Sequence, residues 1–452
     1  MPSFVPHSDF ETKEMLRDLQ MESLEELFQL VDPKLRLKEQ LRLPKGVSEF
    51  EVLDKFLNIG QRNLTGGKAL TTFAGGGAYD HEIPSVLKAL GGRSEFVTAY
   101  TPYQPEVAQG VLQALFEFQT LISRISGLEI SNASIYDGAS SLVEAINLSC
   151  AATSRSSILI SEGVNERYIQ TVETFSKGTG LALQRLRLND KLETDFVNYE
   201  GDSEIAALVV GYPNYFGAVE NLISARDLAD KLGALLVVVY DPISMAVLKN
   251  PGELGADVAV AEGQPFGIPL SFGGPYLGLF STKKEFVRLV PGRLVGETKD
   301  TDGKTAYVTT LRTREQDIRR ERATSNVCTN QTLMAVWATI YLSWLGKAGF
   351  IETAKRCHDN TRYLVEKMSA IDGVTLCNQS YVREVSFQLP IAVDLVIDKM
   401  AEQGYLAGVK GTVRHSSGIT TECLILTATE KRTQDEMDGF VETLEKVVRS
   451  GK

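Results

Sequence analysis

The sequence predicts an α/β fold in which a mostly parallel sheet is flanked by helices and followed by a smaller α+β C-terminal domain. Strand and helix signals alternate between residues 156 and 282, as is typical of parallel sheets built from strand–helix–strand units. One of these strands, Ala234–Tyr240, is a continuous apolar run, as expected of a strand covered on both faces. The predicted strands are Ser157–Ser161, Ala182–Leu188, Ala206–Gly211, Ala234–Tyr240, Val258–Ala261 and Tyr276–Ser281.

We expect three parts along the chain: an N-terminal helical arm at 1–64, a large α/β domain at 65–325 and a small α+β domain at 326–452. In the arm, Ser48 followed by Glu51 predicts a helix start. Two interpretations of this arm are equally favoured: it packs across another subunit, or it folds onto its own domain. The last part is predicted from strands Val374–Leu376, Glu384–Leu389 and Cys423–Thr427 and helices Gln331–Leu345, Ile351–Ile371, Ala392–Gln403 and Gln434–Val448.

Composition narrows the class of protein. A formal net charge of −11 over 452 residues argues against nucleic acid as a partner. No secretory signal begins the chain, and the apolar passage Thr332–Leu345 falls short of the ~20 residues of a membrane span. The 5 cysteines form no CxxC pair, which indicates reduced thiols and a cytoplasmic location. The 4 histidines lie far apart, so no metal site is expected.

The stretch from residue 98 to 127 combines a polar turn with an amphipathic helix. We expect Pro105 at the first helical position and Gly127 at the end of the helix. Tyr100, Tyr103 and Gln104 precede the helix on a turn that contains prolines. From spacing alone, simple packing of the tyrosines is the favoured interpretation, and a contribution to a site is the alternative.

Two further stretches of the sequence can be interpreted either as structural or as functional. Asp137 opens a predicted helix with small residues, an arrangement that can bind an anion, although an ordinary aspartate N-cap is favoured. Residues 291–326 are rich in arginine. A solvated loop with ion pairs is the favoured interpretation of this stretch. The functional alternative is an interface or the rim of an active site.

Asp241 follows the apolar strand directly, at the carboxyl end where open α/β sheets place their ligands. A glycine-rich loop from Gln264 to Gly274 comes later. This is the layout of the cofactor site in pyridoxal-phosphate enzymes of the aspartate-aminotransferase fold, in which a strand-end aspartate pairs the pyridine nitrogen and a lysine attaches the cofactor. Here no basic residue lies between Lys249 and Lys283.

Long motifs connect the chain to a known family. They are YTPYQPE, YPNYFG, DPISMAVLKNPGELGADVAVAEGQPFGIPLSFGGPYLG and RRERATSNVCTNQT. With these motifs the chain resembles the glycine dehydrogenase (decarboxylating) family, the P-protein of the glycine cleavage system, over nearly its whole length. The family's catalytic half carries His-Lys-Thr-Phe before Ile-Pro. Aligning on Ile268-Pro269 places Gln264 where that lysine would stand, so the chain resembles the alpha subunit, subunit 1, of the two-chain form.

The resemblance implies an aspartate-aminotransferase-like fold and a heteromeric enzyme that is inactive as this chain alone. With a beta subunit, it would decarboxylate glycine and pass the aminomethyl group to the lipoyl arm of H-protein. Pyridoxal phosphate is expected covalently on the beta subunit and not on this chain, with Gln264 at the lysine position and Asp241 as a remnant of the pyridine partner. Tyr100, Tyr103 and Gln104 are expected to contribute to a site shared across the interface. No membrane or nucleic acid is expected as a partner.

Two other hypotheses stay open at this point. The chain could be a self-sufficient pyridoxal-phosphate enzyme that uses Lys249 or Lys283, although both stand in surface-like contexts. It could also be a scaffolding or regulatory pseudoenzyme that only stabilises a pyridoxal-phosphate-binding partner.

Overall fold

The computed structural model describes residues 6–37, 39, 41–64, 69–98, 100–197, 199, 201 and 204–451. The chain forms two compact units, Met1–Gly67 and Lys68–Lys452. In the first unit, the helices are α1 Asp9–Asp18, the 3-10 turn Leu24–Phe28 and α2 Glu49–Gly60. The predicted capping box of α2 is present, since Glu51 accepts from the Ser48 backbone N–H at 2.8 Å. No residue of α2 is buried, so its apolar side chains are exposed.

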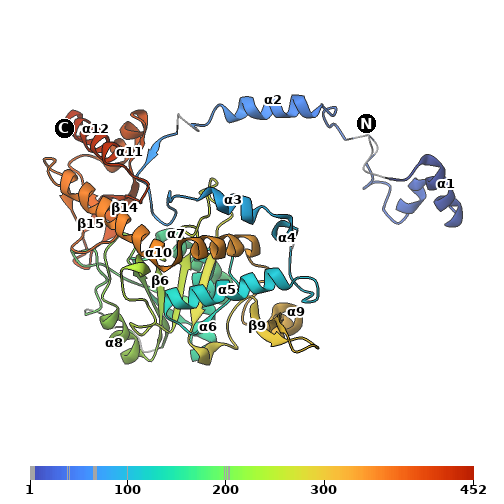
Figure 1. The fold of residues 1–452 in the computed structure, drawn as a ribbon, viewed down its shortest axis with the longest axis horizontal. Helices are drawn as coiled ribbons and strands as arrows, with labels where there is room; N and C mark the ends of the chain where they lie inside the picture. The colour runs from blue at the N-terminus through green and yellow to red at the C-terminus, as the bar shows by residue number, and fades with distance from the viewer. Residues whose placement is uncertain are drawn as a thin grey trace. The chain divides into compact units, whose positions relative to one another are not determined.

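A seven-stranded sheet forms the centre of the second unit (Figure 1). Its order is β2-β8-β7-β6-β5-β3-β4. The five strands β4, β3, β5, β6 and β7 run parallel, whereas β8 and β2 pair antiparallel at one edge. This confirms the mostly parallel sheet. The bounds are β2 Ile130–Ser131, β3 Ser157–Ser161, β4 Ala182–Leu186, β5 Ile205–Tyr212, β6 Leu235–Tyr240, β7 Val258–Glu262 and β8 Gly278–Thr282.

Helices cover both faces of this sheet, because alternate strand residues point to opposite sides. Leu236 and Val238 of β6 face a core shared with α5, α8 and α10, and Val237 faces a core shared with α6 and α7. Double burial explains the continuous apolar run predicted for this strand. The helices are α5 Gln109–Ser126, α6 Gly138–Thr153, α7 Glu166–Thr179, α8 Leu222–Leu232 and α10 Thr332–Met368.

A smaller antiparallel sheet of order β11-β12-β15-β14 follows, packed against α11, α12 and the second half of α10. Its strands are β11 Thr375–Leu376, β12 Glu384–Gln388, β14 Val409–Arg414 and β15 Thr420–Thr427, with α11 Val393–Glu402 and α12 Gln434–Ser450. The short strand β1 Thr71–Thr72 pairs with β13 Tyr405–Leu406. A second glycine-rich loop, which contains Gly75, Gly76 and Gly77 and lies between β1 and α3, therefore begins beside the small sheet.

Helix α10 is the one helix in the described part of the chain that is long and apolar enough to cross a membrane by length and composition alone. Gly346, at φ 59° and ψ −176°, breaks it into two halves, in line with the two helices predicted there. Tyr341 in the first half packs in the core of the large sheet, and Leu364 in the second half packs in that of the small sheet. The helix thus joins two protein cores.

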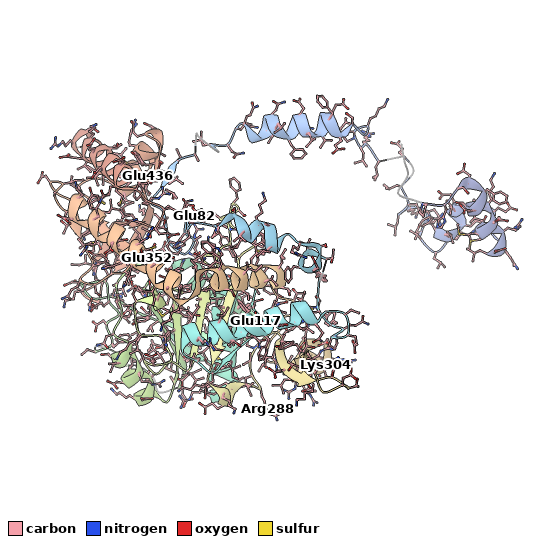
Figure 2. All side chains as sticks on the ribbon, viewed as in Figure 1. Glu82, Glu117, Arg288, Lys304, Glu352 and Glu436 are labelled. Carbon is pink, nitrogen blue, oxygen red and sulfur yellow. The ribbon has the colours of Figure 1, made fainter. Side chains whose placement is uncertain are left out.

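Two sequence expectations are wrong in detail. Helix α5 begins at Gln109 instead of Pro105, because residues 104–108 form turns closed by the N–H groups of Val107 and Ala108, and Ala108 has non-helical φ −125° and ψ 22°. Residues 291–326 contain an antiparallel hairpin, β9 Leu294–Lys299 and β10 Thr305–Thr310, and not only a solvated loop. Lys304, labelled in Figure 2, lies in its turn.

The remaining elements are short. They are α3 Ser85–Gly91, α4 Ser94–Val97, α9 Gln316–Arg319 and the 3-10 turns Ser244–Ala246, Lys284–Phe286, Arg312–Arg314 and Arg320–Arg322.

Gly217 offers a test of how the two sheets fit together. It has φ +88°, and an added Cβ would lie 2.0 Å from the Glu384 carbonyl oxygen of β12. Gly303 has a similar φ of +79° but open space around it. We therefore expect Gly303→Ala to lower the free energy of unfolding by about 1–2 kcal/mol, from backbone strain alone. Gly217→Ala should lower it by about 1–3 kcal/mol more, because the added Cβ also collides with the Glu384 carbonyl. Urea unfolding of the two variants measures both values, and equal losses would contradict the close contact.

Candidate functional site

The carboxyl ends of β3, β5, β6 and β7 meet at a pocket of about 80 Å³. This is the edge at which open α/β sheets bind ligands. Three parts of the chain close it: the strand ends, the glycine-rich loop before α3, and the start of β12 in the small sheet. The lining residues used below are Gly77, Tyr79, Asn165, Tyr168, Asn214, Tyr215, Asp241, Ser244, Glu262, Arg383 and Glu384.

A buried ion pair crosses this pocket. Asp241, at the end of β6 as predicted, receives hydrogen bonds from Arg383 through Nε at 2.9 Å and through Nη2. Ser244 donates to the same carboxylate. Burial would raise the pKa of Asp241, but Arg383 and Ser244 lower it below its ordinary value. The carboxylate is therefore ionised and fully engaged.

The Arg383 guanidinium lies flat against an aromatic ring, with Cζ 3.5 Å from the centroid of Tyr79. The Tyr79 hydroxyl donates to Glu384 at 2.8 Å, and the backbone N–H of Gly76 donates to the same carboxylate at 2.7 Å. Burial raises the pKa of Glu384 to about 7. The glycine-rich loop is thus tied to the small sheet over the mouth of the pocket.

A second acid occupies the anion-binding end of the pocket. Glu262, the last residue of β7, accepts from the backbone N–H groups of Gly138, Gln264 and Leu277, each at 3.0 Å. Gly138 begins α6, so its N–H is one of the free donors that would otherwise bind an anion such as phosphate. Burial raises the pKa of Glu262 to about 8, against the effect of these donors. Asp137 is the N-cap of α6 and accepts from the Ser140 backbone N–H at 2.7 Å. This confirms the N-cap interpretation that the sequence favoured.

Gln264 has a structural role in this arrangement. Its side chain is 2% exposed, donates to the carbonyls of Tyr79 and Ile268 at 3.0 and 2.7 Å, and accepts from the Tyr79 N–H at 2.8 Å. Lys249 and Lys283, the two alternative lysines, do not line the pocket, and Lys283 is paired with Asp257.

These residues do not fit pyridoxal phosphate. The strand-end carboxylate is taken by Arg383, the N–H at the start of α6 by Glu262, and no lysine lines the pocket. The cavity of about 80 Å³ is also small beside the roughly 300–1,000 Å³ of ordinary cofactor sites. Arg383 and Glu262 thus engage the strand-end carboxylate and the first backbone donor of α6, the two kinds of group that a pyridine and a phosphate would use.

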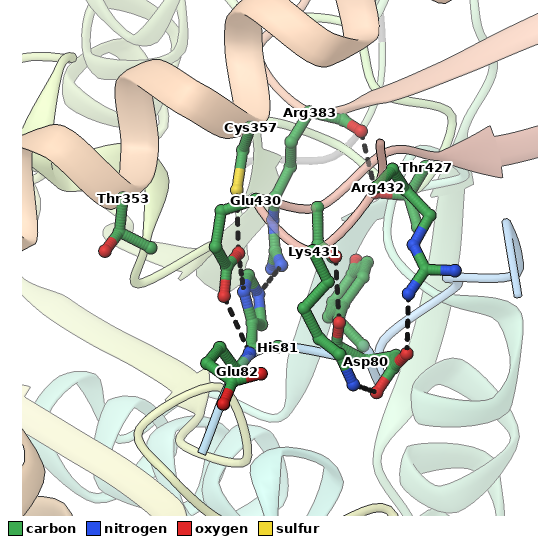
Figure 3. Close-up of polar contacts among 12 residues, drawn as sticks. Asp80, His81, Glu82, Thr353, Cys357, Arg383, Thr427, Glu430, Lys431 and Arg432 are labelled. Carbon is green, nitrogen blue, oxygen red and sulfur yellow. Dashed lines mark hydrogen bonds and ion pairs between the residues drawn. The ribbon is translucent and has the colours of Figure 1, made fainter. Parts of the chain in front are cut away.

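A polar cluster of His81, Cys357 and Glu430 lies beside Arg383 and contacts its guanidinium through His81 (Figure 3). Their donor atoms lie within 4.8 Å of one another, a spacing that would suit a metal ion. However, His81 Nε2 faces Arg383 Nη1, which can only donate. His81 must therefore accept at Nε2 and carry its proton on Nδ1, which lies 2.7 Å from Glu430. The nitrogen that faces the cluster is a donor, so we interpret the cluster as hydrogen-bonded support.

The predicted interface residues lie elsewhere. None of Tyr100, Tyr103 and Gln104 lines the pocket, and Tyr100 is 83% exposed. Tyr103 lies beside Arg293, which donates to its hydroxyl at 3.0 Å, and beneath Arg312. Gln104 is exposed. The structure brings together Asp241 and the loop of Gln264 near the pocket, whereas Tyr100 is exposed and Tyr103 is half-exposed and held by Arg293.

Sequence reasoning missed Glu262 and Arg383. A signal for Glu262 was present, because a single acid closes the apolar strand Val258–Glu262. Arg383 had none, since it lies 142 residues from Asp241 and precedes an ordinary predicted strand.

Comparison with known proteins places this geometry in context. The family model for the glycine cleavage system P-protein matches residues 2–444. A probable glycine dehydrogenase (decarboxylating) subunit 1 from Moorella thermoacetica is 43% identical over 97% of this chain and 98% of its own length. A crystal structure of glycine decarboxylase (P-protein) in inhibitor-bound form superposes with a TM-score of 0.89 at 39% identity, covering 99% of this chain and 100% of that one. Glutamate decarboxylase from Lactobacillus brevis, at 12% identity and a TM-score of 0.69 over 92% of this chain and 96% of that one, shares the fold alone.

The Asp241–Arg383 pair makes a prediction about stability. Asp241→Asn would leave a buried guanidinium without its counter-ion, so we expect a loss of about 3–5 kcal/mol in the free energy of unfolding at pH 7. Because the folded-state pKa of Asp241 is lowered, the pair's contribution is complete above the ordinary aspartate value of ~3.9 and is lost as pH falls through the folded-state value. Urea unfolding between pH 7 and pH 3 measures both effects.

Asp394→Asn is the matched control, since Asp394 is 68% exposed and paired with Lys410 at 2.7 Å. It should cost less than about 1 kcal/mol. A loss for Asp241→Asn no larger than that of the control would contradict the structural weight given to the buried pair.

Proposed function

Because the chain belongs to the glycine cleavage system P-protein family, we propose that it is the subunit of a two-chain glycine decarboxylase that does not hold the cofactor. The observation that carries this proposal is a cofactor pocket filled by the chain's own groups, with Gln264 and not lysine in the loop after β7. Pyridoxal phosphate then belongs, covalently bound, to the partner beta chain. This chain completes that partner's site.

In the proposed reaction, the assembled enzyme decarboxylates glycine and passes the aminomethyl group to the lipoyl arm of H-protein. The chain's own part is to orient substrate and exclude water at the shared surface. Exposed phenol and amide groups at Tyr100, Tyr103 and Gln104 are suited to this, because they can donate hydrogen bonds across an interface without a change of charge. The 5 free cysteines fit a reducing cytoplasm, which we propose as the location.

The second candidate is a scaffolding or regulatory pseudoenzyme that only stabilises its partner. A specific observation favours it: a buried ion pair between Asp241 and Arg383 crosses the pocket and joins the two sheets, so the groups at the strand ends already have a structural role. The two candidates differ in whether exposed groups of this chain affect the rate of the reaction.

Reconstitution is the direct test of the proposed function. We expect the chain, mixed with a beta chain and lipoylated H-protein, to support glycine-dependent release of carbon dioxide, and either chain alone to be inactive. Borohydride reduction followed by peptide mapping should find the phosphopyridoxyl group on the beta chain. The same modification on any lysine of this chain, Lys249 or Lys283 included, would overturn the proposal.

Tyrosine substitutions separate an active contribution from scaffolding. In Tyr100→Phe and Tyr103→Phe, one hydroxyl is lost and little volume changes. If the hydroxyl stabilises the reacting state, turnover should fall by about one to two decades, which corresponds to roughly 1–3 kcal/mol. Sedimentation should show unchanged assembly. Full turnover in both variants would favour the scaffolding role. Tyr307→Phe, a matched change on hairpin strand β10, is the control.

A further inference from the structure

The segment that follows β8 contains a buried positive charge with no counter-ion in contact. Arg293 is 4% exposed, yet it donates only to neutral acceptors: Asn330 Oδ1 at 3.0 Å, the Cys328 carbonyl at 2.9 Å and the Tyr103 hydroxyl at 3.0 Å. Within the described residues, no carboxylate lies within 4.0 Å of its guanidinium. Buried charges in proteins are ordinarily paired, so this arrangement needs an explanation.

A second buried arginine lies in the same segment. Arg314 is 9% exposed, and its Nη1 donates to the Val290 carbonyl. Its Nε and Nη2 are buried and have no hydrogen-bond partner. Glu315 lies within electrostatic reach of Arg293, Arg312 and Arg314, but its own Oε1 is also unpartnered. Three guanidinium groups and the two carboxylates of Glu315 and Asp317 thus act on one another here, and the cations outnumber the acids.

Tyr103 is in contact with two of the arginines in this segment. The Cζ atoms of Arg293 and Arg312 are 5.0 and 5.7 Å from its ring centroid. Because Arg293 donates to the Tyr103 oxygen, the phenolic hydrogen remains free to donate to another group. Tyr103 is 50% exposed and the Arg312 side chain 38% exposed, so a ligand can reach both from outside. Arg312 is held only by exposed Asp317, at 3.2 Å.

We propose that Tyr103, Arg293 and Arg312 form a binding site for an oxyanion, either a phosphate monoester or a carboxylate. Planar guanidinium groups bind such anions through paired hydrogen bonds, and the phenol adds a third donor. The bound oxyanion places a negative charge beside Arg293, whose own hydrogen-bond partners are all neutral. The site rests on the proposed function, in which this surface completes the partner's active site and can meet the cofactor's phosphate or the carboxylate of glycine.

The experiment uses the assembled two-chain enzyme with Arg312→Gln. The control is Arg322→Gln, which removes the same charge from an exposed position in the same segment. The affinity for pyridoxal phosphate is measured by absorbance titration of cofactor-depleted complex, and the KM for glycine by steady-state kinetics. We expect Arg312→Gln to weaken one of them by about 10–100-fold and the control to change neither. A weaker cofactor affinity identifies phosphate, and a raised KM identifies carboxylate.

A second measurement separates this inference from the proposed function. Inorganic phosphate binding to the full chain alone, followed by phosphorus NMR, needs no partner and no turnover. If the complex is inactive with glycine, the proposed function fails, and phosphate binding that is lost in Arg312→Gln but kept in Arg322→Gln still supports the oxyanion site. Two results would contradict the oxyanion site. One is an active complex in which Arg312→Gln changes neither the affinity for the cofactor nor the KM for glycine. The other is an inactive complex together with phosphate binding to the chain that is absent, or that is equal in the two variants.

Discussion

The buried pairing of Asp241 with Arg383 is the contact on which the rest of the large unit depends. It connects the end of the central strand β6 to Arg383, the residue directly before β12 of the small sheet, and both side chains are buried in a region of low dielectric. The guanidinium is held in place by contact with Tyr79 and by His81. Removing one member of such a pair leaves a charge that water cannot reach, so the two sheets and the loop between them act as one unit.

The same pair determines which chemistry the chain can contribute. The Asp241 carboxylate is already bound by Arg383 and Ser244, and the Gly138 N–H at the start of α6 already donates to Glu262. What remains available lies on the surface: the tyrosine turn and the arginines after β8. Under the proposed function, the chain contributes through this outward face and not through the pocket at the strand ends.

Much of the fold could be predicted because it depends on local patterns. Continuous apolar strands such as Ala234–Tyr240 indicated a doubly covered sheet, and the strand-end rule placed Asp241 at the pocket. The hairpin of β9 and β10 was missed because its strands are largely polar and only partly buried, with no continuous apolar run. Arg383 and Arg293 could not be predicted, since burial of an arginine is decided by partners that are distant in the sequence.

The way in which the pocket is filled also determines how many substitutions this chain would need in order to bind the cofactor itself. A lysine placed at position 264 would meet the Tyr79 backbone and a strand end closed by Glu262, with Arg383 still on Asp241. Cofactor binding would need several positions to change together, and each single step would leave a buried charge or backbone donor unpaired. Under the proposed division of labour, stability alone is enough to keep this chain dependent on its partner, without any continuing selection against a second working site.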